Sequence, residues 1–243
     1  MPDQDTLQID RRFCGPPDSG NGGYVCGRLA AFVDSESVVV RLHVPPPLNK
    51  RLNVERDTGS ARLLDGDLLV AEARSGNTGK APGHAPDFAA AKAASRHYPG
   101  FERHAFPTCF VCGPDRKPDD GLCIFPGPVD SGLLVAAPWT PHVSLATADG
   151  EIHPEFLWAA LDCPGAFSFR LPDDRTVLLG ELEVTLLGRV NTGERCVLTG
   201  EELSHDGRKH HTLTALYGES GTCRGYGRAT WIEIPVDAMQ TTA

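Results

Sequence analysis

The sequence predicts an α+β protein made of two similar modules, each combining one central helix with a curved antiparallel sheet. Three observations support this prediction: two helical apolar patterns, a group of strand-like runs after each pattern, and turn residues between the runs. The two similar stretches are residues 21–30 and 153–162, and the apolar pattern of the first continues to residue 33. Each opens with a polar residue and continues with apolar residues at the spacing of an amphipathic helix. These apolar positions are Val25, Leu29, Phe32 and Val33 in the first pattern, and Phe156, Leu157, Ala160 and Leu161 in the second.

Four strand-like runs follow each predicted helix. They are rich in β-branched and apolar residues and are bounded by Gly, Asn, Asp or Pro, as strands usually are. Asp65-Gly66 and Asp206-Gly207 each stand between two runs and predict tight hairpin turns. Strand-like sequence also precedes each helix, at residues 6–13 in the first module and at 121–125 and 133–136 in the second. The eight runs after the helices are 38–44, 52–56, 61–64 and 68–74, then 177–184, 195–203, 210–217 and 224–234.

The connection between the two modules is predicted to be ordered. It covers residues 75–108 and is rich in Gly, Pro and Ala, yet it carries more aromatic residues than disordered linkers usually do. Residues 86–97 within it have the composition of a helix. We therefore place the first module in residues 1–104, with the crossover at about 75–104, and the second in 105–243.

Composition narrows the classes of function. The chain has 243 residues and a formal net charge of −9, and its Lys and Arg residues form no cluster beyond isolated pairs. Nucleic-acid binding depends on such clusters, so a nucleic-acid partner is not expected. No apolar run is long enough to span a bilayer, and residues 1–10 lack the features of a secretory signal. We expect a cytoplasmic protein with reduced cysteines, and exposed sheet edges that could pair with a second copy in a homo-oligomer.

Several motifs resemble those of a known family. The polar residue and glycine pair at Asn21-Gly22-Gly23, followed by a helix and four antiparallel runs, resemble the hotdog fold, in which a curved sheet wraps a central helix. Two such copies resemble the double-hotdog arrangement of acyl-CoA thioesterases. Residues 109–113, Cys-Phe-Val-Cys-Gly, followed by Gly121-Leu122, resemble a segment before the first strand of some single-hotdog thioesterases. The Pro154-Glu155-Phe156 stretch is also similar to double-hotdog proteins, so the resemblance covers most of the chain.

The resemblance implies one composite site. In single-hotdog thioesterases of the phenylacetyl-CoA type the helix begins His-Gly-Gly and carries an Asp nine residues after the His. The first copy here keeps both glycines but has Asn21 for the His and Ala30 at the Asp position. The second copy keeps His153 and Asp162 but replaces the glycines with Pro154 and Glu155. Each copy thus supplies what the other lacks.

Physical chemistry gives these residues roles in thioester hydrolysis. Free N–H groups at a helix start can stabilise the negative charge that develops on a carbonyl oxygen, so Gly22 and Gly23 are the candidate oxyanion donors. Asp162 can act as the base for water or as a nucleophile, and Asn21 can orient the substrate or water. Within one helix these positions are roughly 11–12 Å apart, so the two helices must pack antiparallel to bring the groups together. The mirror site, with Pro154 and Ala30, would be inactive.

The expected function is hydrolysis of an acyl-CoA, or another acyl thioester, at this single site. Water is the co-substrate, and neither a cofactor nor a metal is expected. The candidate substrate-binding residues lie on or next to the two helices, where the acyl tail would enter between the copies. They are Tyr24, His153, Glu155, Phe156 and Trp158.

Two other functions fit the same pattern. One is a non-catalytic acyl-CoA or lipid-binding protein that has lost half of each site. The other, weaker reading is an acyl-thioester hydratase or dehydratase that uses His153 with Glu155. Each site residue also has a structural reading: Asp162 as a solvated carboxylate near a helix end, Gly22-Gly23 as a loop-to-helix joint, and Asn21 as a helix N-cap.

The cysteines allow a further alternative. Cys109-x-x-Cys112 with Cys123 has part of the spacing of a zinc site, and His104 could be a distant fourth ligand. No second Cys-x-x-Cys or His-x3-His completes the pattern, so buried thiols are the favoured interpretation. Cys163 adjoins Asp162 but lacks a His base for a cysteine hydrolase.

Overall fold

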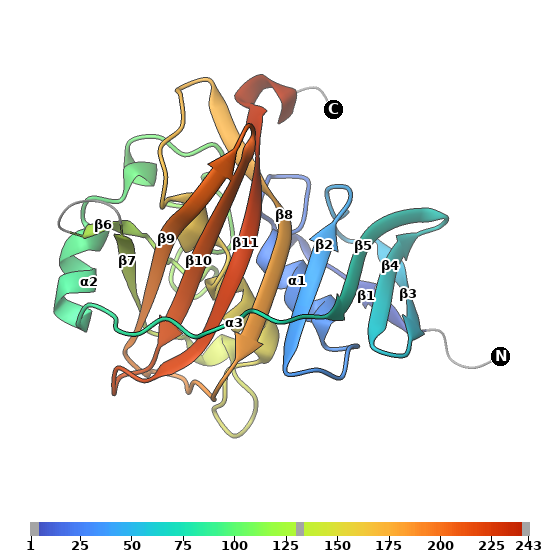
Figure 1. Ribbon diagram of the computed structural model, residues 1–243, viewed down its shortest axis with the longest axis horizontal. Helices are drawn as coiled ribbons and strands as arrows, with labels where there is room; N and C mark the ends of the chain where they lie inside the picture. Colours follow the sequence, from blue (N-terminus) through green and yellow to red (C-terminus); the bar gives the residue numbers. More distant parts are fainter. Residues whose placement is uncertain (1–4, 130–133, 240–243) are drawn as a thin grey trace.

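The computed structural model describes residues 5–129 and 134–239 (Figure 1). Its strands form one 11-stranded sheet in which every neighbouring pair is antiparallel. The first half contains β1 (Thr6–Gln8), α1 (Gly22–Ala30), β2 (Ser37–Leu42), β3 (Arg51–Asp57), β4 (Ser60–Asp65) and β5 (Leu68–Ser75). The connection contains α2 (Phe88–Ser95). The second half contains β6 (Gly127–Val129), β7 (Leu134–Trp139), α3 (Pro154–Ala160), α4 (Cys163–Ala166), β8 (Arg175–Leu186), β9 (Cys196–Asp206), β10 (Lys209–Tyr217) and β11 (Cys223–Pro235). Short 3-10 turns occur at Arg11–Phe13, Pro99–Phe101, Val143–Leu145 and Val236–Met239.

The strand order is nearly symmetric about the centre of the sheet. It runs β1-β3-β4-β5-β2-β8-β11-β10-β9-β7-β6. From the centre outward, one half therefore reads β2, β5, β4, β3, β1 and the other β8, β11, β10, β9, β7. In each half the helix precedes the central strand, and the two central strands pair with Val40 opposite Leu182.

Most of the predicted strands and both predicted hairpins are confirmed. Gly66 and Gly207 have φ values of +60° and +55°, in the left-handed region that a tight turn needs and that glycine adopts without strain. The two turns are not equivalent, because Gly66 joins β4 to β5 whereas Gly207 joins β9 to β10. The prediction of a strand at 121–125 is wrong: the leucine and isoleucine there are buried next to the 109–113 segment instead. Residue 133 of the run predicted at 133–136 lies outside the described residues.

The connection between the halves is ordered, as predicted. Figure 1 shows it crossing in front of β8–β11 before it enters α2. Arg228 Nε donates to the Thr78 carbonyl at 2.9 Å, and the Tyr226 hydroxyl donates to the Gly79 carbonyl at 2.6 Å. The side chain of Asp87 caps α2 by accepting from the Ala90 amide.

Helices α1 and α3 pack against each other in antiparallel orientation, and two glycines of α1 allow the close contact. A Cβ on Gly23 would lie 2.8 Å from the Trp158 carbonyl oxygen, near the end of α3. A Cβ on Gly27, one turn later, would lie 2.7 Å from the Glu155 Cα, near the start of α3. The start of α1 is therefore next to the end of α3. Within the part of the chain that the structure describes, no helix combines the length and apolar character needed to cross a membrane.

Candidate functional site

The antiparallel helix pair brings residues from the two halves together at one carboxylate. Asp162 Oδ2 accepts a hydrogen bond from the Gly23 backbone N–H at 2.9 Å and another from Asn21 Nδ2, also at 2.9 Å. Asn21 and Gly23 lie at the start of α1, while Asp162 lies between α3 and α4. We call these three residues the carboxylate site.

Asn21 has two functions in the local structure. Its Oδ1 accepts from the Tyr24 amide at 2.9 Å, which caps the first turn of α1. Its Nδ2 points to Asp162 at the same time. Ser, Thr or Asp could supply the cap oxygen, but among the common capping residues only Asn has a side-chain N–H donor as well.

The two glycines of the predicted oxyanion pair have different surroundings. The amide of Gly23 is directed at Asp162, and a Cβ on this residue would lie 2.5 Å from the Asp162 Cβ. A Cβ on Gly22 would instead lie 2.7 Å from a Leu179 methyl group in β8. Gly23 is therefore the glycine in contact with the carboxylate, and Gly22 packs against the sheet.

The carboxyl group of Asp162 is buried, and its two oxygens differ in their hydrogen bonds. The residue is 2% exposed. Burial raises the pKa of Asp162 to about 7, against the lowering effect of the Gly23 N–H and the Asn21 amide; the nearby Cys109 adds to the rise. Oδ1 has no hydrogen-bond partner among the described residues. One oxygen is thus held by two donors, and the other remains free to interact with a small polar group.

The remaining predicted site residues lie in three different surroundings. Tyr24 and Phe156 are buried in an aromatic cluster, their ring centroids 5.8 Å apart and Phe13 stacked on Tyr24 at 4.2 Å. The Tyr24 hydroxyl accepts from Arg28, and burial raises the pKa of this tyrosine. His153 is exposed at the start of α3 and makes no side-chain cap.

Glu155 and Trp158 line a cavity of about 580 Å³ at the opposite end of the helix pair. There the end of α1 meets the start of α3, and Ala30 and Pro154 contribute to the lining together with Gly27. This is the mirror position that the sequence predicts to lack catalytic parts.

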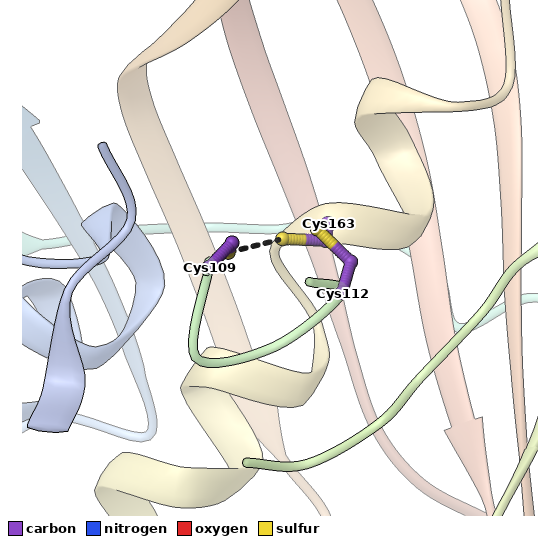
Figure 2. Close-up of side chains that lie close together, drawn as sticks. All are labelled: Cys109, Cys112 and Cys163. Atoms are coloured by element: carbon purple, nitrogen blue, oxygen red, sulfur yellow. Dashed lines mark hydrogen bonds between the residues drawn. The ribbon is translucent and has the colours of Figure 1, made fainter. Parts of the chain in front are cut away.

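Three cysteines gather beside the carboxylate site; the sequence spacing predicts a link between Cys109 and Cys112 but none to Cys163. Cys109 and Cys163 have their sulfurs 3.9 Å apart, and Cys112 belongs to the same group (Figure 2). Cys109 Sγ is 3.9 Å from Asn21 Nδ2. Cys123 lies elsewhere, its thiol directed at the Arg116 carbonyl. The one signal in the sequence was the position of Cys163, directly after the candidate catalytic Asp.

Comparisons with known proteins identify the fold. No protein-family model matches the chain, and no curated protein matches it. A candidate thioesterase II from Thermobifida fusca is similar in structure, with 14% identity, coverage of 94% of this chain and 91% of that one, and a TM-score of 0.60. An acyl-CoA thioesterase II, TesB2, from Mycobacterium marinum gives 12% identity, 95% and 92% coverage, and a TM-score of 0.59. At such low identity the likeness shows the fold alone, and the large antiparallel sheet with few helices fits a hotdog-like fold.

Proposed function

We propose that the chain hydrolyses acyl thioesters, with acyl-CoA as the leading substrate class, at the single composite site of Asn21, Gly23 and Asp162. The observation that carries the proposal is the contact of the Asp162 carboxylate with donors from the start of α1 at 2.9 Å. Its support is the fold shared with proteins named as thioesterases. We further infer that the chain consists of two hotdog modules, residues 1–104 and 105–243, because the strand order repeats on either side of the β2–β8 pair.

Each residue of the carboxylate site would have a separate role in thioester hydrolysis. When water attacks a thioester carbonyl carbon, negative charge develops on the carbonyl oxygen. The Gly23 N–H can donate to that oxygen once its hydrogen bond to Asp162 Oδ2 is broken. Asp162 takes a proton from the attacking water, the carbon–sulfur bond breaks, and the thiolate leaves with a proton returned from Asp162. Direct attack by the carboxylate, followed by hydrolysis of the anhydride, uses the same contacts. Asn21 holds the carboxylate in position in either case.

Access to the site requires movement. Asp162 is 2% exposed, and the segment that carries Cys109 lies against it. A substrate can therefore reach the carboxylate only if residues 109–113 or the adjoining helix ends shift. The shift would replace the bond between Gly23 and Asp162 by a bond between Gly23 and the substrate, which keeps the buried N–H satisfied.

A second candidate function rests on a different observation. The cavity of about 580 Å³ lies at the other end of the helix pair, where Ala30 and Pro154 replace the catalytic parts. Ligand pockets have volumes of about 300–1,000 Å³. A non-catalytic acyl-CoA or lipid-binding protein would use this cavity and keep the carboxylate site closed.

The two candidates are separated by an assay of the purified full chain against a panel of acyl-CoAs that differ in length, branching and aromatic content. Release of free CoA is followed with a thiol reagent and corrected with a substrate-free blank for the protein's own cysteines. We expect turnover with at least one substrate. A folded protein that binds an acyl-CoA but cleaves none of the panel supports the second candidate and overturns the first; absorbance of the enoyl group tests for hydratase activity in the same samples.

A further inference from the structure

A buried group of three thiols beside the carboxylate site has no role in the proposed hydrolysis. The sulfurs of Cys109, Cys112 and Cys163 all lie within 4.8 Å of one another, and all three residues are buried. Two come from one loop and the third from the first residue of α4, 54 positions from Cys109. Figure 2 shows the three side chains converging from these two segments.

The spacing of the sulfurs fits a single tetrahedral ion. A zinc–sulfur bond is about 2.3 Å long, which places two thiolates of a tetrahedral site about 3.8 Å apart. The Cys109 and Cys163 sulfurs are 3.9 Å apart. A soft, sulfur-only group of ligands favours zinc over the hard cations that prefer oxygen.

The loop that carries two of the cysteines is held by backbone contacts. The loop closes through the Gly113 amide, which donates to the Cys109 carbonyl at 2.9 Å, and a Cβ on Gly113 would lie 2.5 Å from the Pro107 oxygen. This backbone holds the Cys109 and Cys112 sulfurs in place, and the thiolate is the form that would bind a metal.

His104 contacts the group from outside. Its Nε2 lies 3.3 Å from the Cys112 sulfur, while its Nδ1 accepts from the Phe106 amide at 2.9 Å. A neutral imidazole whose Nδ1 accepts a hydrogen bond carries its proton on Nε2, so His104 donates to the sulfur. His104 would become a fourth ligand only by giving up the bond to Phe106.

We propose that Cys109, Cys112 and Cys163 bind one Zn²⁺ ion through their sulfurs. The ion joins the loop 109–113 to the turn that carries Asp162, so it stabilises the arrangement of the carboxylate site without taking part in thioester cleavage. The fourth tetrahedral position is left for a solvent ligand or for His104. The charge of the ion offsets that of the buried thiolates, which could not otherwise ionise together in the interior.

Metal analysis of the untagged full chain, purified in reducing buffer without chelator, tests the proposal. We expect about one zinc per chain by mass spectrometry of the metal content. Substitution of each ligand, Cys109→Ser, Cys112→Ser or Cys163→Ser, is expected to reduce zinc to a small fraction of that value. Cys123→Ser is the matched control, because the Cys123 thiol is close to Cys112 along the chain but does not belong to the three-sulfur group. This variant should retain the zinc.

Cobalt substitution keeps the test valid if a serine variant fails to fold. Wild-type protein is stripped with a chelator, checked for folding by circular dichroism, and titrated with Co²⁺; a thiolate-to-cobalt charge-transfer band that saturates at one equivalent supports the site. Folded, reduced wild type that contains no zinc and gives no such band overturns the proposal. A disulfide between Cys109 and Cys163, or equal zinc loss in Cys123→Ser, overturns it too. Metal content is measured without a substrate, so failure here leaves the proposed hydrolysis untouched.

Discussion

The two ends of the α1/α3 helix pair share one geometry but differ in chemistry. At one end the start of α1 meets the end of α3, and Asn21, Gly23 and Asp162 form a closed, hydrogen-bonded site. At the other end Ala30 and Glu155 stand at the equivalent places beside a cavity of about 580 Å³. The packing is tight in both places because Gly23 and Gly27 each face the backbone of α3.

The cavity and the buried acid therefore lie at opposite ends of the helix pair. The cavity is lined by the small side chains of Ala30 and Ala31 among others. At the carboxylate end Asp162 is buried, and the Cys109 loop lies against Asn21. Pocket volume favours the end that lacks the buried acid, whereas the hydrogen bonds of Asp162 and its unpartnered Oδ1 support our proposal of a site at the carboxylate end.

Removing the acid is expected to have the largest effect. Asp162→Asn keeps the size of the side chain but can neither accept the proton of water nor attack the carbonyl, so turnover should fall by about 10²–10⁴-fold. Release of CoA under saturating substrate measures it. Glu155→Gln, at the cavity end, is the matched control and should leave turnover within about twofold. Equal losses in both variants would remove the distinction between the two ends.

The same acid should dominate a pH dependence of stability. Because the folded-state pKa of Asp162 is about 7 against an ordinary value of 3.8, the folded protein holds a proton that the unfolded chain releases between these values. The free energy of unfolding should fall by roughly 4 kcal/mol as pH rises from about 4 to 7 and then level off. Urea unfolding of wild type and Asp162→Asn across this range isolates the contribution as their difference. Parallel curves for the two proteins would contradict it.

Much of this arrangement is predictable from local sequence. Alternating runs and Asp-Gly turns predict the strands because each of these signals depends only on residues that are neighbours in the sequence. The meeting of Gly23 with Asp162 follows from one further step: groups at opposite ends of similar helices converge only if the helices are antiparallel. The sequence does not show that the two halves join edge to edge at β2 and β8, because pairing between distant strands depends on the whole sheet.

The surroundings of the site were less predictable. Tyr24 follows Gly23 directly, yet successive helical residues point about 100° apart, so its ring stacks on Phe13 away from the carboxylate. Cys163 joins Cys109 through tertiary packing, and no spacing rule connects thiols 54 positions apart. The zinc alternative from the sequence combined Cys109 and Cys112 with Cys123 because Cys123 is close to them along the chain.

A methyl group tests the two glycines against each other. Gly23→Ala and Gly27→Ala would each place a Cβ within 2.8 Å of α3 atoms, so each should destabilise the fold by about 1–3 kcal/mol. Only Gly23→Ala also displaces Asp162, and only this variant should lose turnover when both are assayed at a temperature where both remain folded. Denaturant unfolding supplies the stability values, and a comparable loss of turnover in Gly27→Ala would show that helix packing alone sets the rate.

Asn21 allows its capping and orienting functions to be separated. Asn21→Ser retains an oxygen for the Tyr24 amide but removes the donor to Asp162, so stability should change little while turnover falls about tenfold, the kinetic equivalent of one hydrogen bond to a charged group. Asn21→Ala should lose the cap as well and about 1 kcal/mol of stability. Thermal unfolding and steady-state kinetics on both variants distinguish the two contributions. Full activity in Asn21→Ser would confine this residue to the cap.

Filling the cavity is expected to have the smallest effect on turnover. Ala30→Leu places a larger apolar side chain at the lining of the 580 Å³ space without touching Asp162, so CoA release should stay within about twofold of wild type. Calorimetric titration with a non-hydrolysable acyl-CoA analogue measures binding in the same variant. If hydrolysis and binding both survive, the substrate reaches Asp162 from the carboxylate end. If binding disappears, the acyl group occupies the cavity at the open end. Continued CoA release would then mean that the cavity binds the acyl group while Asp162 cleaves it, and loss of CoA release would mean that the cavity end replaces the carboxylate end as the site.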